Sequence, residues 1–116
     1  MTVDEIFTKL ASHMIEGMMI HDELSNGYDF LGLYGFAKCH VYHHLAETKG
    51  YECLMHYYSI HYHKLLIIDK IPQPEIIPQA WYKHTTMDVD TNTKRQAVQI
   101  MMKKWVDWER DTKQLY

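Results

Sequence analysis

The chain has 116 residues and a formal net charge of −3, with 47% hydrophobic and 23% charged residues. This length fits one domain, residues 1–116, with a modest hydrophobic core of its own. The net negative charge gives no electrostatic basis for binding nucleic acid or an anionic membrane. No stretch approaches the roughly 18 apolar residues that a membrane span requires. We therefore expect a soluble domain with neither nucleic acid nor a membrane as its partner.

The N-terminal residues MTVDEIFTKL contain neither a cationic segment nor a long apolar run, so the sequence predicts no signal peptide and a cytoplasmic location. The two cysteines, Cys39 and Cys53, are expected to be reduced there. They are also expected to lie about 10 Å apart along facing helices, which is too far for a disulfide bond.

Residues 3–24 predict a long helix. Thr2 and Glu5 fit the capping-box pattern that starts a helix. Apolar and small residues then recur at alternating spacings of four and three, typical of the buried face of a bundle helix: Val3, Phe7, Leu10, Met14, Gly17, His21 and Leu24. Gly27, in Ser25-Asn26-Gly27, is expected to end this helix in the left-handed conformation.

The same spacing predicts two further helices. One has the buried face Phe30, Tyr34, Ala37, Val41, His44 and Thr48, and Lys49-Gly50 is expected to end it. The next has the buried face Leu54, Tyr58, His61, Leu65 and Ile68. Both predicted turns are short, so consecutive helices are expected to be antiparallel neighbours.

Residues 69–87 interrupt the helical pattern with Pro72, Pro74 and Pro78. Their isoleucines and Trp81 are too apolar for a free linker, which predicts an ordered crossover without long regular structure. A last helix is expected from Asp88 or Asp90 to about Leu115, with the buried face Val98, Met101, Trp105, Trp108, Thr112 and Leu115. The sequence thus predicts an all-α fold: an antiparallel four-helix bundle with a Pro-rich ordered crossover between helices three and four.

The nine histidines can be sorted by helical phase, because successive residues turn about 100° around a helix. The predicted buried faces carry His21, His44 and His61, and their edges carry His13 and His40. The other histidines are expected to face solvent or to lie in the crossover: His43, His56, His63 and His84.

With turns near residues 26–27 and 49–50, three histidines from three helices are expected at one level. Three neutral imidazole nitrogens suit one divalent metal, such as zinc or iron, with an open coordination position. Glu47 would be a ligand or would orient a histidine by accepting its hydrogen bond. His21 is expected about two turns away. The predicted metal site consists of His13, His40 and His61 at that level, with His44 and Glu47 about one turn below.

A second interpretation stays open. A histidine on an apolar face is usually a core residue held by one hydrogen bond, and a buried network of His, Tyr and Glu would give the same sequence pattern. No Gly-rich phosphate loop, Cys-x-x-Cys pair or nucleophile elbow is present, so no nucleotide cofactor is expected. No catalytic residue can be assigned, and whether the protein is an enzyme stays open.

Short antiparallel helices with inward His and Glu, together with the HxxxH pair of His40 and His44, resemble the ferritin-like and related metal-binding four-helix families. The resemblance covers the three N-terminal helices and implies a metal centre inside the bundle. A di-iron centre of that class would require ExxH pairs, which this sequence lacks. The pattern is closer to the single-metal, three-histidine site of DinB-like bundles, although those are longer and differently connected.

Two hypotheses for the function follow. The first is a small metal-binding helical protein, hydrolytic or a metal carrier. The second is a non-enzymatic module that binds a protein partner or a second copy of itself, while the buried histidines form a structural network. Side chains that would form such a surface, if they share one exposed patch, are Met18, Met19, Tyr42, Tyr62 and Trp81.

Overall fold

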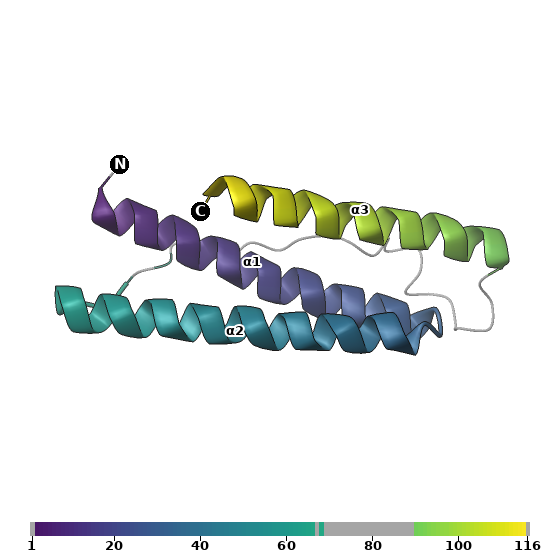
Figure 1. Ribbon diagram of the computed structural model, residues 1–116, viewed down its shortest axis with the longest axis horizontal. Coiled ribbons are helices and arrows are strands. Elements are labelled where there is room, and N and C mark those ends of the chain that lie inside the picture. Colours follow the sequence, from purple (N-terminus) through teal and green to yellow (C-terminus); the bar gives the residue numbers. More distant parts are fainter. Residues whose placement is uncertain (1, 67, 69–89, 116) are drawn as a thin grey trace.

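A computed structural model of the chain describes residues 2–66, 68 and 90–115. These residues form three long helices, α1 (Val3–Phe30), α2 (Tyr34–Tyr62) and α3 (Thr91–Leu115), and contain no strand (Figure 1). The all-α part of the predicted fold is therefore confirmed for the described part of the chain. The predicted crossover at residues 69–87 lies outside it.

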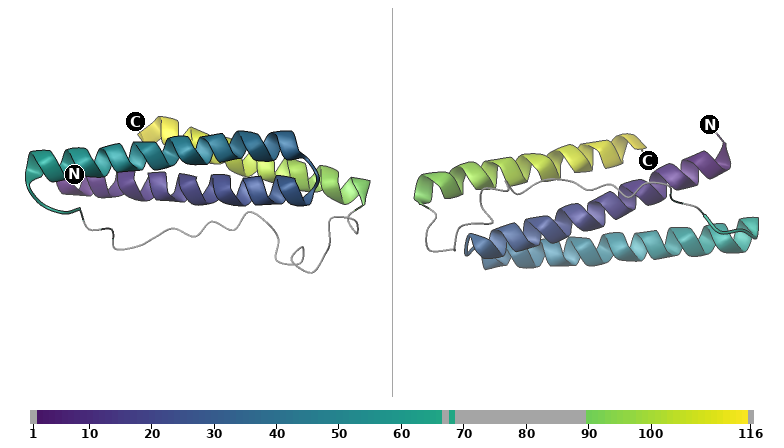
Figure 2. Two further views of the ribbon diagram at one scale, coloured as in Figure 1. Left: turned by 90° about the horizontal axis from the view of Figure 1, so that it is seen from below. Right: turned by 180° about the vertical axis from the view of Figure 1, so that it is seen from behind.

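The helices α1 and α2 form an antiparallel hairpin, and α3 lies along α1 (Figures 1 and 2). In both views α3 runs antiparallel to α1 and in the same direction as α2. The molecule is elongated, with extents of 53 × 24 × 23 Å. No helix within the described residues combines the length and apolar character needed to cross a membrane.

The predicted four-helix bundle is wrong because α2 continues through Lys49-Gly50, where a turn was expected. The predicted second and third helices are one helix of 29 residues. A glycine inside a helix costs only about 1 kcal/mol relative to alanine. The two halves of α2 pack against α1 with one continuous inner face, which includes His40 and Tyr58, so packing outweighs this cost.

The first predicted turn is also misplaced. Gly27 is a buried helical residue, and α1 ends at Phe30. In the short connection from Leu31 to Leu33, Gly32 has the left-handed backbone, at φ 77°. Because a later turn moves the register of an antiparallel pair by twice its own displacement, every facing pair predicted from the earlier turn changes.

The predicted starts of the first and last helices and the predicted end near Leu115 are accurate. The predicted end of the third helix is wrong, because α2 ends at Tyr62, before Leu65 and Ile68, which were expected on its buried face. Thr2 caps α1 by accepting a hydrogen bond from the Glu5 amide at 3.1 Å. Asp90 caps α3 by accepting one from the Thr93 amide at 2.8 Å. At the far end of the hairpin, Asp4 accepts hydrogen bonds of 2.7 Å from both the Tyr58 hydroxyl and the Lys64 ammonium group.

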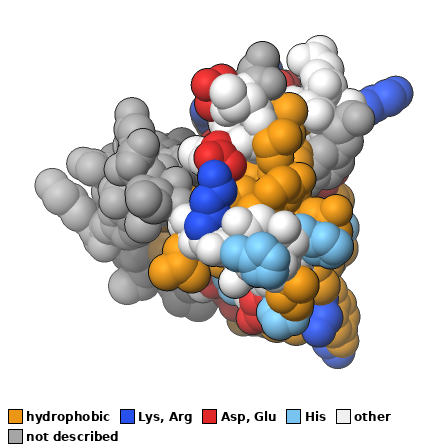
Figure 3. Space-filling model, turned by 90° about the vertical axis from the view of Figure 1, so that its left-hand side faces the viewer, with side chains coloured by type: hydrophobic (Ala, Val, Ile, Leu, Met, Phe, Trp, Pro, Cys, Tyr) orange, Lys and Arg blue, Asp and Glu red, His pale blue; other side chains and the backbone are white. Residues whose placement is uncertain are grey.

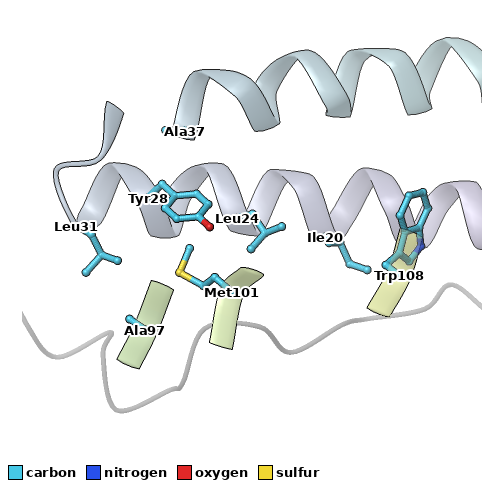
Figure 4. Packing of buried hydrophobic residues seen from close by; sticks show 8 residues of the cluster. All are labelled: Ile20, Leu24, Tyr28, Leu31, Ala37, Ala97, Met101 and Trp108. Atoms are coloured by element: carbon cyan, nitrogen blue, oxygen red, sulfur yellow. The ribbon is translucent and has the colours of Figure 1, made fainter. Parts of the chain in front are cut away.

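The hydrophobic core lies where α3 covers the hairpin (Figure 4). Most of its buried side chains come from α1 and α3, and α2 contributes the small Ala37. The members of this core are Ile20, Leu24, Tyr28, Leu31, Ala37, Ala97, Met101 and Trp108. The face of α3 predicted from the sequence is thus the one that packs.

One close approach fixes α3 against α1. The indole ring of Trp108 lies directly over Gly17, so that a Cβ atom at position 17 would overlap the ring. Gly17 is therefore required by packing rather than by backbone conformation.

Cys39 and Cys53 are both free and exposed, which confirms that they form no disulfide. The reason differs from the expected one, since both lie on α2. Fourteen residues separate them, which corresponds to about 21 Å along a helix.

Candidate functional site

The most unusual feature of the core is a pair of buried histidines. His21 on α1 is 0% exposed and His40 on α2 is 1% exposed. Their Nδ1 atoms are 3.0 Å apart, a hydrogen bond between two imidazoles. His21 follows Gly17 and precedes Leu24 on the packed face of α1, while His40 follows Ala37 on α2, so both face the interior because their helices do.

This bond requires two different tautomers, because only one of the two Nδ1 atoms can carry the shared hydrogen when both rings are neutral. Within the described part of the chain, the other ring nitrogen of His21 (Nε2) is buried without a partner, and so is the indole N–H of Trp108. The rings of His21 and Trp108 meet edge to face, with centroids 5.6 Å apart. If His21 donates its Nδ1 hydrogen to His40, the Nε2 atom of His21 is an acceptor, and the indole N–H of Trp108 is an unused donor on the neighbouring ring. The tautomer of His21 with its hydrogen on Nδ1 therefore suits these surroundings better.

A third imidazole and two indoles complete the cluster. His43 stacks on His21 with ring centroids 5.0 Å apart and planes 18° apart. Trp105 meets His40 and His43 edge-on, at centroid distances of 4.7 and 5.2 Å. We call this set the imidazole cluster: His21, His40, His43, Trp105 and Trp108.

The hydrogen bond between His21 and His40 limits what the imidazole cluster can do chemically. The two Nδ1 atoms face each other, so the lone pair of one of them is already used. Among the described residues, no group of three or more His, Cys, Asp or Glu side chains is placed to hold a metal ion. As it stands, the imidazole cluster is a polar and aromatic network rather than a ligand cage.

Burial keeps the paired histidines uncharged. Burial, followed by the neighbouring His40, His43 and His44, lowers the pKa of His21 to about 3. Burial also lowers the pKa of His40 to about 4, with His43 as the next cause. Both rings are therefore neutral at pH 7, and charging either would place a cation in the apolar interior beside another imidazole.

The structure does not bring the predicted metal ligands together. His13 lies away from His40 and contacts α3: its Nε2 is 2.6 Å from the Thr112 hydroxyl, and its ring stacks on Trp108 at 4.7 Å. Thr112 donates its own hydrogen to the Trp108 carbonyl. The hydroxyl oxygen therefore accepts from His13, and burial lowers the pKa of this histidine.

His61 is exposed near the end of α2, where its ring stacks on Tyr57 at 4.1 Å. It follows His40 by 21 positions in the same helix, which is about 31 Å. The expected common level of His13, His40 and His61 is therefore wrong. Figure 3 looks at the end of the molecule where α1 begins and α2 ends, and it shows histidine and hydrophobic side chains next to each other on the surface.

His44 and Glu47 share the inner face of α2 with His40. His44 donates from Nδ1 to the Met18 carbonyl at 2.8 Å. Glu47 is half-buried, and burial together with the nearby Glu109 raises its pKa. Three of the five predicted ligands thus lie along one face, two of them half-buried, but spread over two helical turns.

Sequence reasoning missed the roles of His21 and His43. His21 was placed on the correct face but at the wrong height, because the predicted turn came too early. His43 was expected to face solvent, yet it is half-buried against His21. A signal was present in Trp105 and Trp108, whose large rings on the packed face of α3 require wide contacts on the facing helices.

Neither of two surface hollows is lined by a member of the imidazole cluster. One, of about 400 Å³, is lined by Leu31, Leu33, Thr91, Lys94, Arg95, Val98 and Gln99. The other, of about 570 Å³, lies along α1 and is lined by Asp4, Glu5, Thr8, Lys9, Ser12, His13, Glu16 and Leu115. Of the predicted ligands, His13 alone lines one of these two hollows.

Comparison with known proteins identifies no relative: no family model, curated protein or solved structure matches the chain. The resemblance to ferritin-like and DinB-like bundles stays a prediction from sequence.

Proposed function

We propose that this protein is a non-enzymatic helical interaction module whose binding surface is the face of α2 turned away from α1. One observation carries the proposal. Tyr42, Leu45 and Ile60 are 61%, 56% and 53% exposed on that face. Large apolar side chains that lie in a row on a surface are characteristic of protein-binding sites.

The interior supports the same reading. His21 and His40 bond to each other, the half-buried His44 bonds to the Met18 carbonyl and the half-buried His13 bonds to Thr112. These bonds serve the packing of the three helices. Of the surface residues expected from the sequence, Tyr42 and Tyr62 are exposed, Met18 and Met19 are half-buried, and Trp81 lies outside the described residues. The exposed row on α2 is therefore a better candidate surface than the methionines.

Site-specific photo-crosslinking tests the module. A photoreactive benzoylphenylalanine at Leu45 should give discrete protein adducts in cells, identified by mass spectrometry. The same group at the exposed Gln99 of α3 is the matched control and should give none of them. Identical adduct patterns from the two positions would contradict the proposal.

Metal binding is the second candidate, because His40, His44 and Glu47 lie along one face of α2. A zinc or iron ion there would need the rings of the imidazole cluster to reorient. Elemental analysis of protein purified without a metal-affinity tag separates the candidates. One metal ion per chain would favour the metal-binding protein, and metal far below one per chain would favour the module.

If a metal is bound, a chelator should lower the melting temperature of the wild-type protein, and His40→Ala should remove that effect. His56→Ala, on the exposed face of α2, should leave it intact. A melting curve that responds to neither chelator nor added zinc would exclude this candidate.

The cytoplasmic location expected from the sequence belongs to the same proposal. In that compartment the exposed Cys39 and Cys53 would stay reduced. Fractionation of cells that express the tagged protein tests it.

A further inference from the structure

We propose that the partner of this surface is a second copy of the chain, bound antiparallel through α2 in a two-fold symmetric dimer. This inference rests on the function proposed above and names its partner. The residues involved are all exposed and form what we call the outer row: Tyr42, Leu45, Ala46, Lys49, Glu52, Cys53, His56, Tyr57 and Ile60.

The spacing of the outer row is that of a helix–helix seam. Its central positions recur at alternating intervals of four and three: Tyr42, Ala46, Lys49, Cys53, His56 and Ile60. Such a 3.5-residue period keeps one stripe in contact with another helix along its whole length. This stripe is centred opposite His40 and Tyr58, the buried residues that face α1.

The outer row is also self-complementary, which points to a second copy. Tyr42 and Ile60 are equally far from Tyr51, on either side of it along the helix. In an antiparallel pair with its two-fold axis at the level of Tyr51, Tyr42 of each chain lies beside Ile60 of the other. Leu45 then meets His56 of the second copy, and the small Ala46 meets Tyr57, so that a large side chain faces a smaller or polar one.

The charges near the axis follow the same symmetry. Lys49 and Glu52 lie on opposite sides of Tyr51 and point to the same side of the seam. Antiparallel pairing therefore brings Lys49 of each chain next to Glu52 of the other, and forms two equivalent ion pairs. Within the described part of the chain, neither residue takes part in an ion pair. An isologous dimer uses both charges of both copies, as two-fold symmetry requires.

Charge reversal gives the first test. By analytical ultracentrifugation, the wild-type chain should form a dimer whose proportion rises with concentration. Lys49→Glu alone would place two acidic residues opposite each other, and Glu52→Lys alone would place two basic ones. Each variant should associate at least tenfold more weakly than the wild type, whereas an equimolar mixture should form a heterodimer. Changes within one helix cannot produce rescue by mixing.

Lys103→Glu is the matched control, because Lys103 is an exposed lysine on α3 outside the outer row. It should leave the dimer unchanged. A wild-type chain that stays monomeric at every concentration would overturn the proposal. So would a dimer that both single charge reversals leave intact, or one that the mixture fails to restore.

The two cysteines test the orientation. In the proposed dimer the two copies of Cys53 are offset by about 6 Å along the seam, whereas the two copies of Cys39 are offset by about 36 Å. A short bismaleimide should therefore crosslink the dimer of Cys39→Ser but not that of Cys53→Ser. The reverse result would exclude the antiparallel register about Tyr51.

The outcomes also separate this inference from the proposed function. Adducts from Leu45 to other proteins, with a chain that stays monomeric, would leave the module standing and remove the second copy as its partner. Absence of both specific adducts and association would remove both.

Discussion

The helices α2 and α3 differ in the polar and apolar residues that they bury and expose. In α3 the buried residues are Ala97, Met101 and Trp108, and charged side chains such as Lys103 are exposed. In α2 a histidine is among the three buried residues, whereas Tyr42, Leu45 and Ile60 face outwards. The helix α3 is thus an ordinary amphipathic helix, and α2 carries apolar side chains on the face that the described part of the chain leaves exposed.

This difference has a physical consequence for each helix. The energy that holds α3 in place comes from burying apolar area against α1. The inner face of α2 depends in part on neutral imidazoles, whose burial is tolerated only while their polar atoms are paired and uncharged. We therefore expect the packing of α3 to be weakened most by truncation of its buried apolar side chains. The packing of α2 should be weakened most by loss of the hydrogen bonds of its histidines or by their protonation.

The largest effect should come from Trp108→Ala. The Trp108 ring lies over Gly17 and stacks on His13, so its removal leaves a cavity between α1 and α3. We expect the free energy of unfolding to fall by about 3–5 kcal/mol, measured by urea denaturation. Val106→Ala, at a position 52% exposed on the same helix, is the control and should change little. Equal losses from both would show that α3 does not pack as described.

Acid should destabilise the hairpin through the imidazole cluster. The pKa of His21 is about 3 and that of His40 is about 4 in the folded protein, against about 6.5 when unfolded. The unfolded chain therefore binds more protons below pH 6.5, so stability is lost as pH falls from 6.5 towards 4 and 3. At pH 5 each ring should cost about 2 kcal/mol relative to pH 7.5.

Urea denaturation at both pH values measures this loss. His21→Gln should make it smaller, whereas His56→Gln, at an exposed position, should leave it as in the wild type. Equal stability of the wild type at pH 7.5 and pH 5 would mean that the pair is not buried as a neutral couple.

The difference between α2 and α3 also explains which parts of the fold could be predicted from the sequence. The sequence predicted the N-cap of α1 at Thr2, and it predicted the end of α3 at Leu115 and the packed face of α3. In these places the residues that recur with the helical period are also the residues that are buried. In α2 the helical period and burial do not agree: its outer row has nearly the same period as its inner face, so a helix break at Gly50 was as consistent with the pattern as a continuous helix. The presence of a glycine does not show whether the helix ends there or continues because the residues before and after the glycine pack against a neighbouring helix.

The prediction of the candidate site was wrong for a related reason. It placed His13, His40 and His61 at the same height on three helices, which depends on the positions of two turns. An error of a few residues in a turn is doubled in the pairing of residues on the facing helices. His40, His44 and Glu47 were placed correctly on one face because they share a helix. The contact of His40 with His21 could not be read before the turn at Gly32 was known.

A smaller effect should come from alanine at two glycines. Gly17→Ala pushes a methyl group into the Trp108 ring, so we expect a loss of about 1–3 kcal/mol. Gly35→Ala meets nothing within 4 Å and should instead stabilise α2, by up to about 1 kcal/mol from helix propensity. Thermal melts of the two variants should therefore shift in opposite directions. If Gly17→Ala were as stable as the wild type, α1 and α3 would not be in close contact at Gly17 and Trp108.

The smallest effect should come from Leu45→Ala, and it tests the outer face of α2 most directly. Leu45 is 56% exposed, whereas Leu24, in the core, is 0% exposed. Truncating Leu24 to alanine should cost about 2–5 kcal/mol. Truncating Leu45 should cost less than about 0.5 kcal/mol when the chain is dilute and monomeric, as at other surface positions. If a second copy binds as proposed, Leu45→Ala should cost more at concentrations that favour the dimer, because it then removes a buried contact. A large loss in the dilute monomer would mean that the chain itself covers Leu45, and the contrast between the exposed face of α2 and the packed face of α3 would fail.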